Sequence, residues 1–191
     1  GGGTIVIGYG NPAWSQRNLT VFDGCVAVKS GSGNVDVAIN GFLTPAAGPV
    51  SCELGTVVHD GDRSSFDGFE FKETSAPVFY DLATTSVPLN GAGDAWNSKI
   101  SNKGIVTTNR NPAFQNTLGY DASVFDLPNA GNAQLGNSKT SGTVRFFSNN
   151  ENVIATVLTT SISQYNPSFA FDKTATDING GSLVPGDSIR Y

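Results

Sequence analysis

The stretch Val35-Asp-Val-Ala-Ile-Asn40 is the clearest structural signal in this chain. Valine and isoleucine alternate in it with smaller or polar residues, and this period of two places the three β-branched side chains on one face of a strand. That face is expected to be buried and the other to meet water. The stretch therefore predicts a half-buried β-strand.

Comparable runs on both sides of this stretch predict that most of the chain consists of strands. Gly, Pro, Asn and Asp separate the runs, as expected of turns. The Asp23-Gly24 pair predicts a turn, and the last two runs predict a hairpin joined through 149–152. The predicted strands are Thr4–Tyr9, Leu19–Phe22, Cys25–Val28, Val35–Asn40, Glu53–His59, Phe69–Lys72, Val78–Leu82, Ala122–Leu127, Thr143–Ser148 and Val153–Ile162.

No segment has a strong apolar period of 3.6 residues, and only Asp94–Ile100 is a candidate for a short helix. Many short strands with connections too short for crossover helices favour two packed antiparallel sheets. The predicted fold is all-β, a two-sheet sandwich or jelly roll with long connecting loops and little helix.

Composition supports a folded domain and excludes two classes of partner. The chain has 191 residues and an aromatic content of 10%, so it carries the apolar surface that disordered chains lack. Its net charge is −5 and its basic residues are scattered, which argues against nucleic acid. No run of 18 apolar residues is present, so membrane insertion is not expected.

Sequence character changes near Tyr165-Asn-Pro167, where we place a domain boundary. We expect residues 1–163 to form the sandwich and 164–191 to be a linker followed by the first strands of another unit. The second part ends where a strand should continue, so it is predicted to be an assembly strand that pairs with a neighbour. The residues assigned to that strand are Phe169, Phe171, Lys173, Ile189 and Tyr191.

The segment Asp172-Lys-Thr-Ala-Thr-Asp-Ile-Asn-Gly-Gly-Ser-Leu-Val-Pro-Gly-Asp-Ser-Ile-Arg-Tyr191 resembles the opening of an Ig-like conserved repeat. This repeat, called domain of unknown function eleven, occurs in tandem in large bacterial surface proteins. The resemblance implies an extracellular, cell-surface location. It also implies neighbouring copies or repeats of the same surface protein as partners.

The upstream part resembles a domain of unknown function that often precedes such repeats in exported proteins. The motifs that carry this likeness are Gly8-Tyr-Gly-Asn-Pro12, Arg17-Asn-Leu-Thr-Val-Phe-Asp-Gly24, Leu54-Gly-Thr-Val-Val-His-Asp-Gly-Asp-Arg63, Asn111-Pro112 and Leu118-Gly-Tyr-Asp121. Relatives continue upstream of Thr4–Tyr9, so the likeness implies that the domain starts before Gly1. It implies no catalytic residue.

Cys25 and Cys52 are the only two cysteines. An even pair in an exported domain predicts one disulfide, and two buried free thiols are the alternative. The absence of methionine leaves no other sulfur in the chain.

Asp60, Asp62 and Asp67 form the densest group of carboxylates in the sequence. Calcium prefers six to eight oxygen ligands, which these side chains, Ser64 and backbone carbonyls would supply. Arg63 lies inside the group and favours the alternative, a plain acidic turn. Calcium is thus the one cofactor that the sequence suggests.

Nothing in the sequence indicates a catalytic centre. His59 is the single histidine, and no G-x-S-x-G motif is present. Our hypothesis is a non-enzymatic extracellular module, structural or adhesive, that serves as a subunit of a filament or surface assembly. The alternative is a carbohydrate-binding or carbohydrate-active module that meets a glycan or host-cell ligand through aromatic residues such as Trp14, Trp96, Tyr120 and Tyr165.

Overall fold

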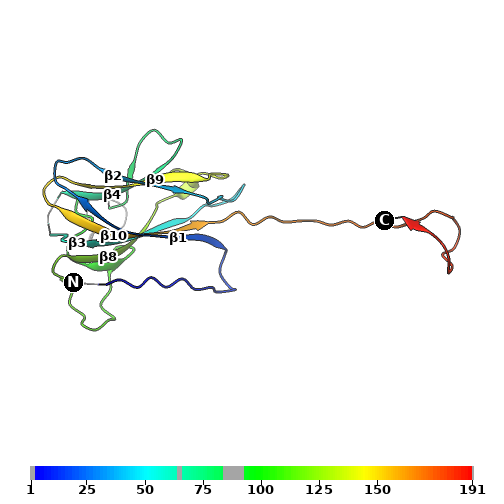
Figure 1. The fold of residues 1–191 in the computed structure, drawn as a ribbon, viewed down its shortest axis with the longest axis horizontal. Helices are drawn as coiled ribbons and strands as arrows, with labels where there is room; N and C mark the ends of the chain where they lie inside the picture. Colours follow the sequence, from blue (N-terminus) through cyan, green and yellow to red (C-terminus); the bar gives the residue numbers. More distant parts are fainter. Residues whose placement is uncertain (1–2, 64–65, 84–92, 191) are drawn as a thin grey trace.

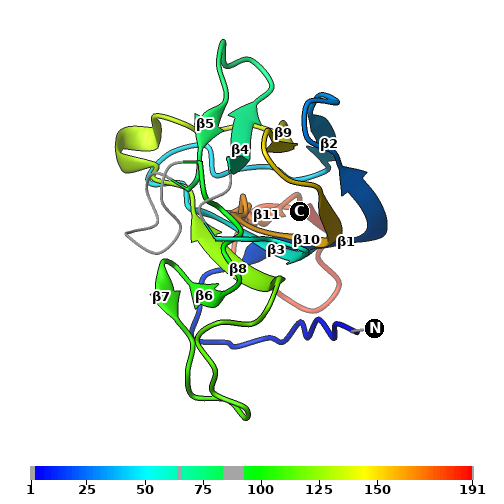
Figure 2. The same ribbon diagram turned by 90° about the vertical axis from the view of Figure 1, so that its left-hand side faces the viewer.

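A computed structural model describes residues 3–63, 66–83 and 93–190. The structure is nearly all-β, and its two main sheets pack face to face, as the end-on view in Figure 2 shows. This arrangement confirms the predicted β-sandwich. The described helical structure consists of one 3₁₀ turn, η1 (Ala130–Asn132), and no described helix is long and apolar enough to cross a membrane.

The larger sheet has six strands in the order β1-β10-β3-β8-β6-β7. Neighbouring strands are antiparallel except β6 and β8, which are parallel. In this spatial order the strands are β1 (Arg17–Val28), β10 (Val153–Ser163), β3 (Cys52–His59), β8 (Tyr120–Asp126), β6 (Ile100–Asn102) and β7 (Ile105–Val106).

The smaller sheet has four antiparallel strands in the order β2-β9-β4-β5. They are β2 (Val35–Asn40), β9 (Ser141–Ser148), β4 (Asp67–Glu73) and β5 (Tyr80–Asp81). The strand predicted from Val35 to Asn40 is confirmed with the same bounds, and its alternation places Ile39 in the core.

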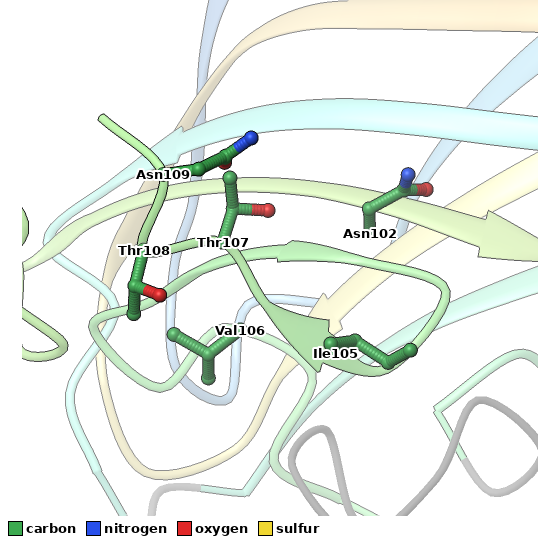
Figure 3. Close-up of a pocket in the computed structure, with 6 residues that line it drawn as sticks. All are labelled: Asn102, Ile105, Val106, Thr107, Thr108 and Asn109. Atoms are coloured by element: carbon green, nitrogen blue, oxygen red, sulfur yellow. The ribbon is translucent and has the colours of Figure 1, made fainter.

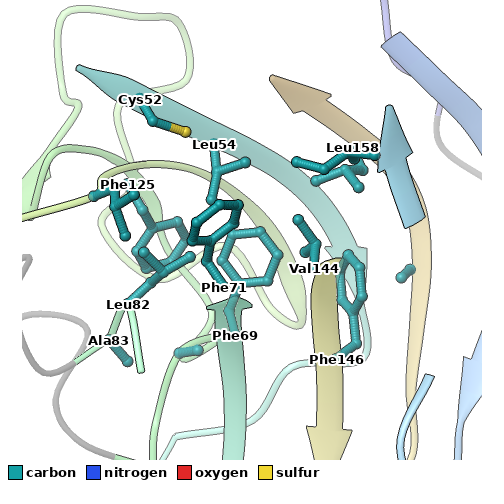
Figure 4. Packing of buried hydrophobic residues seen from close by; sticks show 14 of the residues in the cluster. Cys52, Leu54, Phe69, Phe71, Leu82, Ala83, Phe125, Val144, Phe146 and Leu158 are labelled. Carbon is teal, nitrogen blue, oxygen red and sulfur yellow. The ribbon is translucent and has the colours of Figure 1, made fainter. Parts of the chain in front are cut away.

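Large aromatic side chains fill the space between the sheets. Phe69 of β4 packs against Phe125 of β8 and Phe146 of β9, with ring centroids 5.2 and 5.1 Å apart, and Trp96 stacks on Phe146. Figure 4 shows Phe69, Phe71, Phe125 and Phe146 converging from strands of both sheets. Burying each such ring contributes roughly 1.5–3 kcal/mol, so this cluster stabilises the contact between the sheets.

The segments 143–148 and 153–162 do not form the predicted hairpin. β9 pairs with β2 and β4 in the smaller sheet, whereas β10 pairs with β1 and β3 in the larger one. The connection through 149–152 therefore crosses between the sheets. The alternation of apolar and polar residues shows which face of each strand is buried. The same alternation is found whether the two strands pair with each other or lie in opposite sheets.

Three other local predictions were wrong. The runs 19–22 and 25–28 form one strand, β1, because Asp23-Gly24 lies in a bulge where the register shifts rather than in a turn. Thr4–Tyr9 forms no strand in the structure, since no neighbouring strand pairs with it. The described part of Asp94–Ile100 contains no helix, and β6 begins at its last residue.

Beyond β10 the chain leaves the sandwich. Tyr165 is tied back through its N–H to the carbonyl of Leu43 at 2.7 Å, and residues 166–175 then continue without strand pairing. A two-stranded hairpin follows, made of β11 (Thr176–Asp177) and β12 (Ile189–Arg190). In Figure 1 this part projects far from the sheets.

Candidate functional site

The first candidate site is the outer edge of β1. β1 pairs with β10 on one side, and no described strand pairs with its other side. Alternate N–H and C=O groups along that edge consequently lack a strand partner. Such an edge is a template for adding another strand, and proteins usually protect it with Lys, Pro or a bulge. In β1 the bulge at Asp23–Val26 protects the second half, so Asn18–Phe22 remains the open part.

The outer face of the larger sheet next to this edge is partly apolar. Leu19 and Val21 point outward and are exposed, whereas Phe22 points inward and packs against the core. Directly opposite residues in an antiparallel pair share a face, and Leu19 lies opposite Ser161, which lies opposite Glu53. Leu19, Ser161 and Glu53 therefore form one row across three strands.

The N-terminal segment adds the second wall of a groove over this row. The groove has a volume of about 940 Å³ and is lined by Ile7–Asn11, Ala13–Arg17, Leu19, Glu53 and Ser161. In Figure 1 this N-terminal segment runs beneath the larger sheet before it turns into β1. An extended chain or a short oligosaccharide matches this size.

A local turn holds the aromatic residues of the groove. The Trp14 N–H donates to the carbonyl of Asn11 at 3.1 Å, and the Ala13 N–H donates to Asn11 Oδ1 at 2.9 Å. This turn brings the Trp14 ring to 5.7 Å from the Tyr9 ring, with the planes tilted by 58°. The two rings do not form a flat platform; they make an angled recess that suits edge-to-face contact with another ring.

Arg17 fixes the floor of the groove where β1 begins. Its guanidinium donates to Ser161 Oγ at 2.5 Å, to the Ser161 carbonyl at 2.7 Å and to Ser51 Oγ at 2.7 Å. It therefore links β1, β10 and the start of β3. These bonds hold the guanidinium in one position before any ligand arrives.

The exposed segment 166–175 carries most of the predicted assembly residues. Phe169 is 74% exposed and Phe171 is 92% exposed, and their rings lie 6.2 Å apart on the same side of the chain. Ile189 lies in β12 and pairs with Asp177, so it belongs to a different element. Tyr191 lies outside the described residues.

The predicted calcium ligands do not converge on one point. Asp67 is fully buried, and its Oδ1 accepts hydrogen bonds from the Ala95 and Trp96 N–H groups at 2.7 and 3.0 Å. Asp60 and Asp62 are exposed, and Ser64 lies outside the described residues. No three His, Cys, Asp or Glu side chains in the described part of the chain are placed to hold a metal ion. The grouping in sequence was misleading because Asp67 already belongs to β4 and points into the core.

Asp67 is instead influenced by Glu151, a neighbour that no sequence pattern indicates. Glu151 Oε2 accepts the Asp62 N–H at 3.0 Å, while Asp67 Oδ2 and Glu151 Oε1 are buried and meet no hydrogen-bond donor among the described residues. Burial and the Glu151 carboxyl raise the pKa of Asp67 to about 9.

Asp121 is a second buried carboxyl near this pair. Its Oδ1 accepts the Lys99 N–H at 2.8 Å, and burial raises its pKa to about 7. Asp67, Glu151 and Asp121 thus each accept hydrogen bonds from backbone N–H groups of the connecting loops.

The predicted disulfide between Cys25 and Cys52 is wrong, since both are free thiols. β10 lies between the strands that carry the two cysteines. Cys52 is opposite Ile162 of β10, whereas the bulge that contains Cys25 lies next to Ala155 of β10. Seven positions correspond to about 23 Å along a strand, and a disulfide needs Cα atoms within about 7 Å. The strand register therefore rules out the bond.

A second hollow lies at the opposite edge of the larger sheet and is a weak candidate. It has a volume of about 300 Å³ and is lined by Asn102, Ile105, Val106, Thr107, Thr108 and Asn109. In Figure 3 these side chains spread in different directions. Without a charged group among its lining residues, this hollow offers only neutral hydrogen bonds.

The remaining aromatic candidates are dispersed. Trp96 is fully buried, and its Nε1–H donates to Thr56 Oγ1 at 3.2 Å, so it is a core residue. Tyr120 packs edge-on against His59 at 5.3 Å. Of the four aromatics singled out in the sequence, only Trp14 lines the groove. Tyr9 was missed, because its role depends on the turn at Asn11 that brings it to Trp14.

Comparisons with known proteins add no relative. No family model, no curated protein and no solved structure matches this chain.

Proposed function

We propose that the protein is a non-enzymatic, extracellular structural or adhesive module that joins copies or repeats of a surface protein by strand addition. The observation that carries this proposal is the open edge of β1 in a molecule that also exposes the segment 166–175, which forms no strand. An acceptor edge and a donor segment on one chain suit a subunit of a filament or surface assembly.

The composition and the resemblance of 172–191 to an Ig-like surface repeat support the cell-surface part of the proposal. The chain has few charged residues and no methionine. Calcium is not needed for this role, because strand addition depends on backbone hydrogen bonds.

The oligomeric state of the full chain, measured by analytical ultracentrifugation, tests the proposal. Val21→Lys places a charge on the open edge, and Ala170→Pro removes an N–H from the exposed segment; each is expected to abolish self-association. Ile105→Lys introduces the same charge on β7, at the other edge of the sheet, and is the matched control. A wild-type chain that stays monomeric at every concentration would contradict the proposal.

A carbohydrate-binding role is the second candidate, and the groove beside Tyr9 and Trp14 is the observation that favours it. The tilt between the rings weakens it, since sugars usually lie flat on aromatic faces. Binding to a glycan array that disappears in Trp14→Ala would support this role. Glycan hydrolysis abolished by a single carboxylate substitution would instead indicate an enzyme.

A further inference from the structure

We propose that the groove beside β1 binds Phe169 and Phe171 of a second copy of this chain, so that the copies join head to tail. This inference rests on the proposed function and names the surface and the occupant. The groove is apolar where Ile7, Trp14 and Leu19 line it, and the two phenylalanines are the most prominent apolar groups of segment 166–175.

The groove and the open edge of β1 form one continuous surface. Arg17 and Leu19 belong to both, because they lie in β1 and their side chains point to the outer face of the sheet. A strand added to β1 would project every second side chain toward that face. Phe169 and Phe171 are two positions apart, so both rings enter the groove while the backbone pairs with Asn18–Phe22.

The direction in which the chain leaves β10 favours the groove of a second molecule over the protein's own groove as the acceptor of segment 166–175. Arg17 lies opposite Ser163, so β10 ends beside the start of β1 and the chain continues past that end. Segment 166–175 therefore runs away from β1 of the same molecule, and Figure 1 shows it leading away from the sheets. The ten residues 166–175 span up to about 35 Å when extended, which is enough to reach an adjacent molecule.

A stable contact between two copies must bury more surface than the two phenylalanine rings provide, so the backbone of the segment has to contribute as well. Two phenylalanine rings bury on the order of 300–500 Å², whereas a stable interface buries about 1,200 Å² or more over both partners. Ring insertion alone falls short of this area. Strand pairing along Asn18–Phe22 supplies the remainder, and the angled Tyr9–Trp14 recess provides the specificity.

The charged residues near the groove are compatible with the pairing of segment 166–175 along β1. Lys173 alternates onto the face of Phe169 and Phe171, and Glu53 lies in the wall of the groove. Glu53 is already paired with Lys103 at 2.8 Å and lies 4.0 Å from the Arg17 guanidinium, so Lys173 adds little attraction there and the binding rests on the rings and the backbone. Because donor and acceptor surfaces differ, the contact is heterologous and repeats into a ring or an open filament.

Complementation between two variants provides the test. F169S/F171S keeps the acceptor groove but loses the donor rings, whereas Trp14→Ala keeps the donor and damages the groove; Leu19→Lys is a second acceptor variant. Each variant alone is expected to self-associate at least about 30-fold more weakly than wild type. An equimolar mixture of F169S/F171S and Trp14→Ala should give dimers, since one intact donor meets one intact acceptor.

Ile178→Ser/Leu183→Ser is the matched control, because it removes two exposed apolar side chains from the terminal hairpin and should assemble like wild type. Circular dichroism of each variant serves as the check that it is folded. Assembly of F169S/F171S at wild-type strength would overturn the inference while leaving strand addition intact, and this result would point to the apolar N-terminal segment of a neighbour as the occupant. A monomeric wild type would overturn both proposals.

Discussion

The carboxyl of Glu151 helps to raise the pKa of the buried Asp67 carboxyl, and Glu151 Oε2 accepts the Asp62 N–H at 3.0 Å. The hydrogen bond between Asp62 and Glu151 joins the connection between β3 and β4 to the connection between β9 and β10. The connection between β9 and β10 is the one that carries the chain from the smaller sheet to the larger one, so this crossing is tied to the loop that precedes β4.

The stability of the protein should fall as the pH rises from about 4 to about 9. Folding raises the pKa of Asp67 from its ordinary value of 3.8 to about 9, so between these values the folded state binds more protons than the unfolded state. The stabilising contribution is complete below the lower value and is lost toward the upper one. Asp121, with its pKa raised to about 7, acts in the same direction. Thermal unfolding across this pH range measures the effect, which is on the order of 1 kcal/mol per pH unit.

Asp67→Asn should reduce this pH dependence. The amide keeps an oxygen for the Ala95 and Trp96 N–H groups and offers an N–H to Glu151 without needing a proton from solution. We expect the variant to be at least as stable as wild type at pH 9. Asp60→Asn is the control, because Asp60 is exposed and its φ of 67° is one that asparagine tolerates. An unchanged slope in Asp67→Asn would contradict the raised pKa of Asp67.

Phe69→Ala should destabilise the fold by about 3–5 kcal/mol, measured by chemical denaturation. Phe69 is fully buried and contacts Phe125, Phe146 and Trp96, so its removal leaves a cavity between the sheets. Phe169→Ala makes the same change at an exposed position and should alter stability by less than about 0.5 kcal/mol. Similar losses in the two variants would show that the tail belongs to the core.

Gly61→Ala should destabilise the fold by about 1–3 kcal/mol. A Cβ at Gly61 would overlap the Asp121 carboxylate and lie 2.8 Å from Trp96 Cβ, and both residues are fully buried. Gly24→Ala has open space around its Cβ and provides the control in the same denaturation experiment. Equal stability of the two variants would contradict the close packing of the loop against Trp96.

Alkylation without reductant should label the two cysteines differently. Cys25 is exposed and should react in the folded protein, whereas Cys52 is buried and burial raises its pKa to about 12. Mass spectrometry should therefore detect one adduct under native conditions and two after unfolding. Finding no adduct after unfolding would show that the thiols are joined after all.

Local patterning predicted much of the fold, because each strand must bury one face whatever its partners are. The alternation in Val35–Asn40 placed β2 at its observed bounds, and the run Glu53–His59 was extended by only one residue in β3. The class of fold follows from such segments. The pairing of strands does not follow from such segments. For this reason the prediction of a hairpin from 143–148 and 153–162 was wrong, since the two strands lie in different sheets.

The sequence by itself determined that this protein is a β-sandwich, since alternating apolar residues and turn residues act over a few positions. Only the tertiary structure decided that Cys25 and Cys52 lie too far apart to bond, that Asp67 meets Glu151, and that Tyr9 and Trp14 form a groove with Leu19. These relationships depend on strand order and register. Strand order and register arise from long-range contacts, and no local pattern of side chains encodes them.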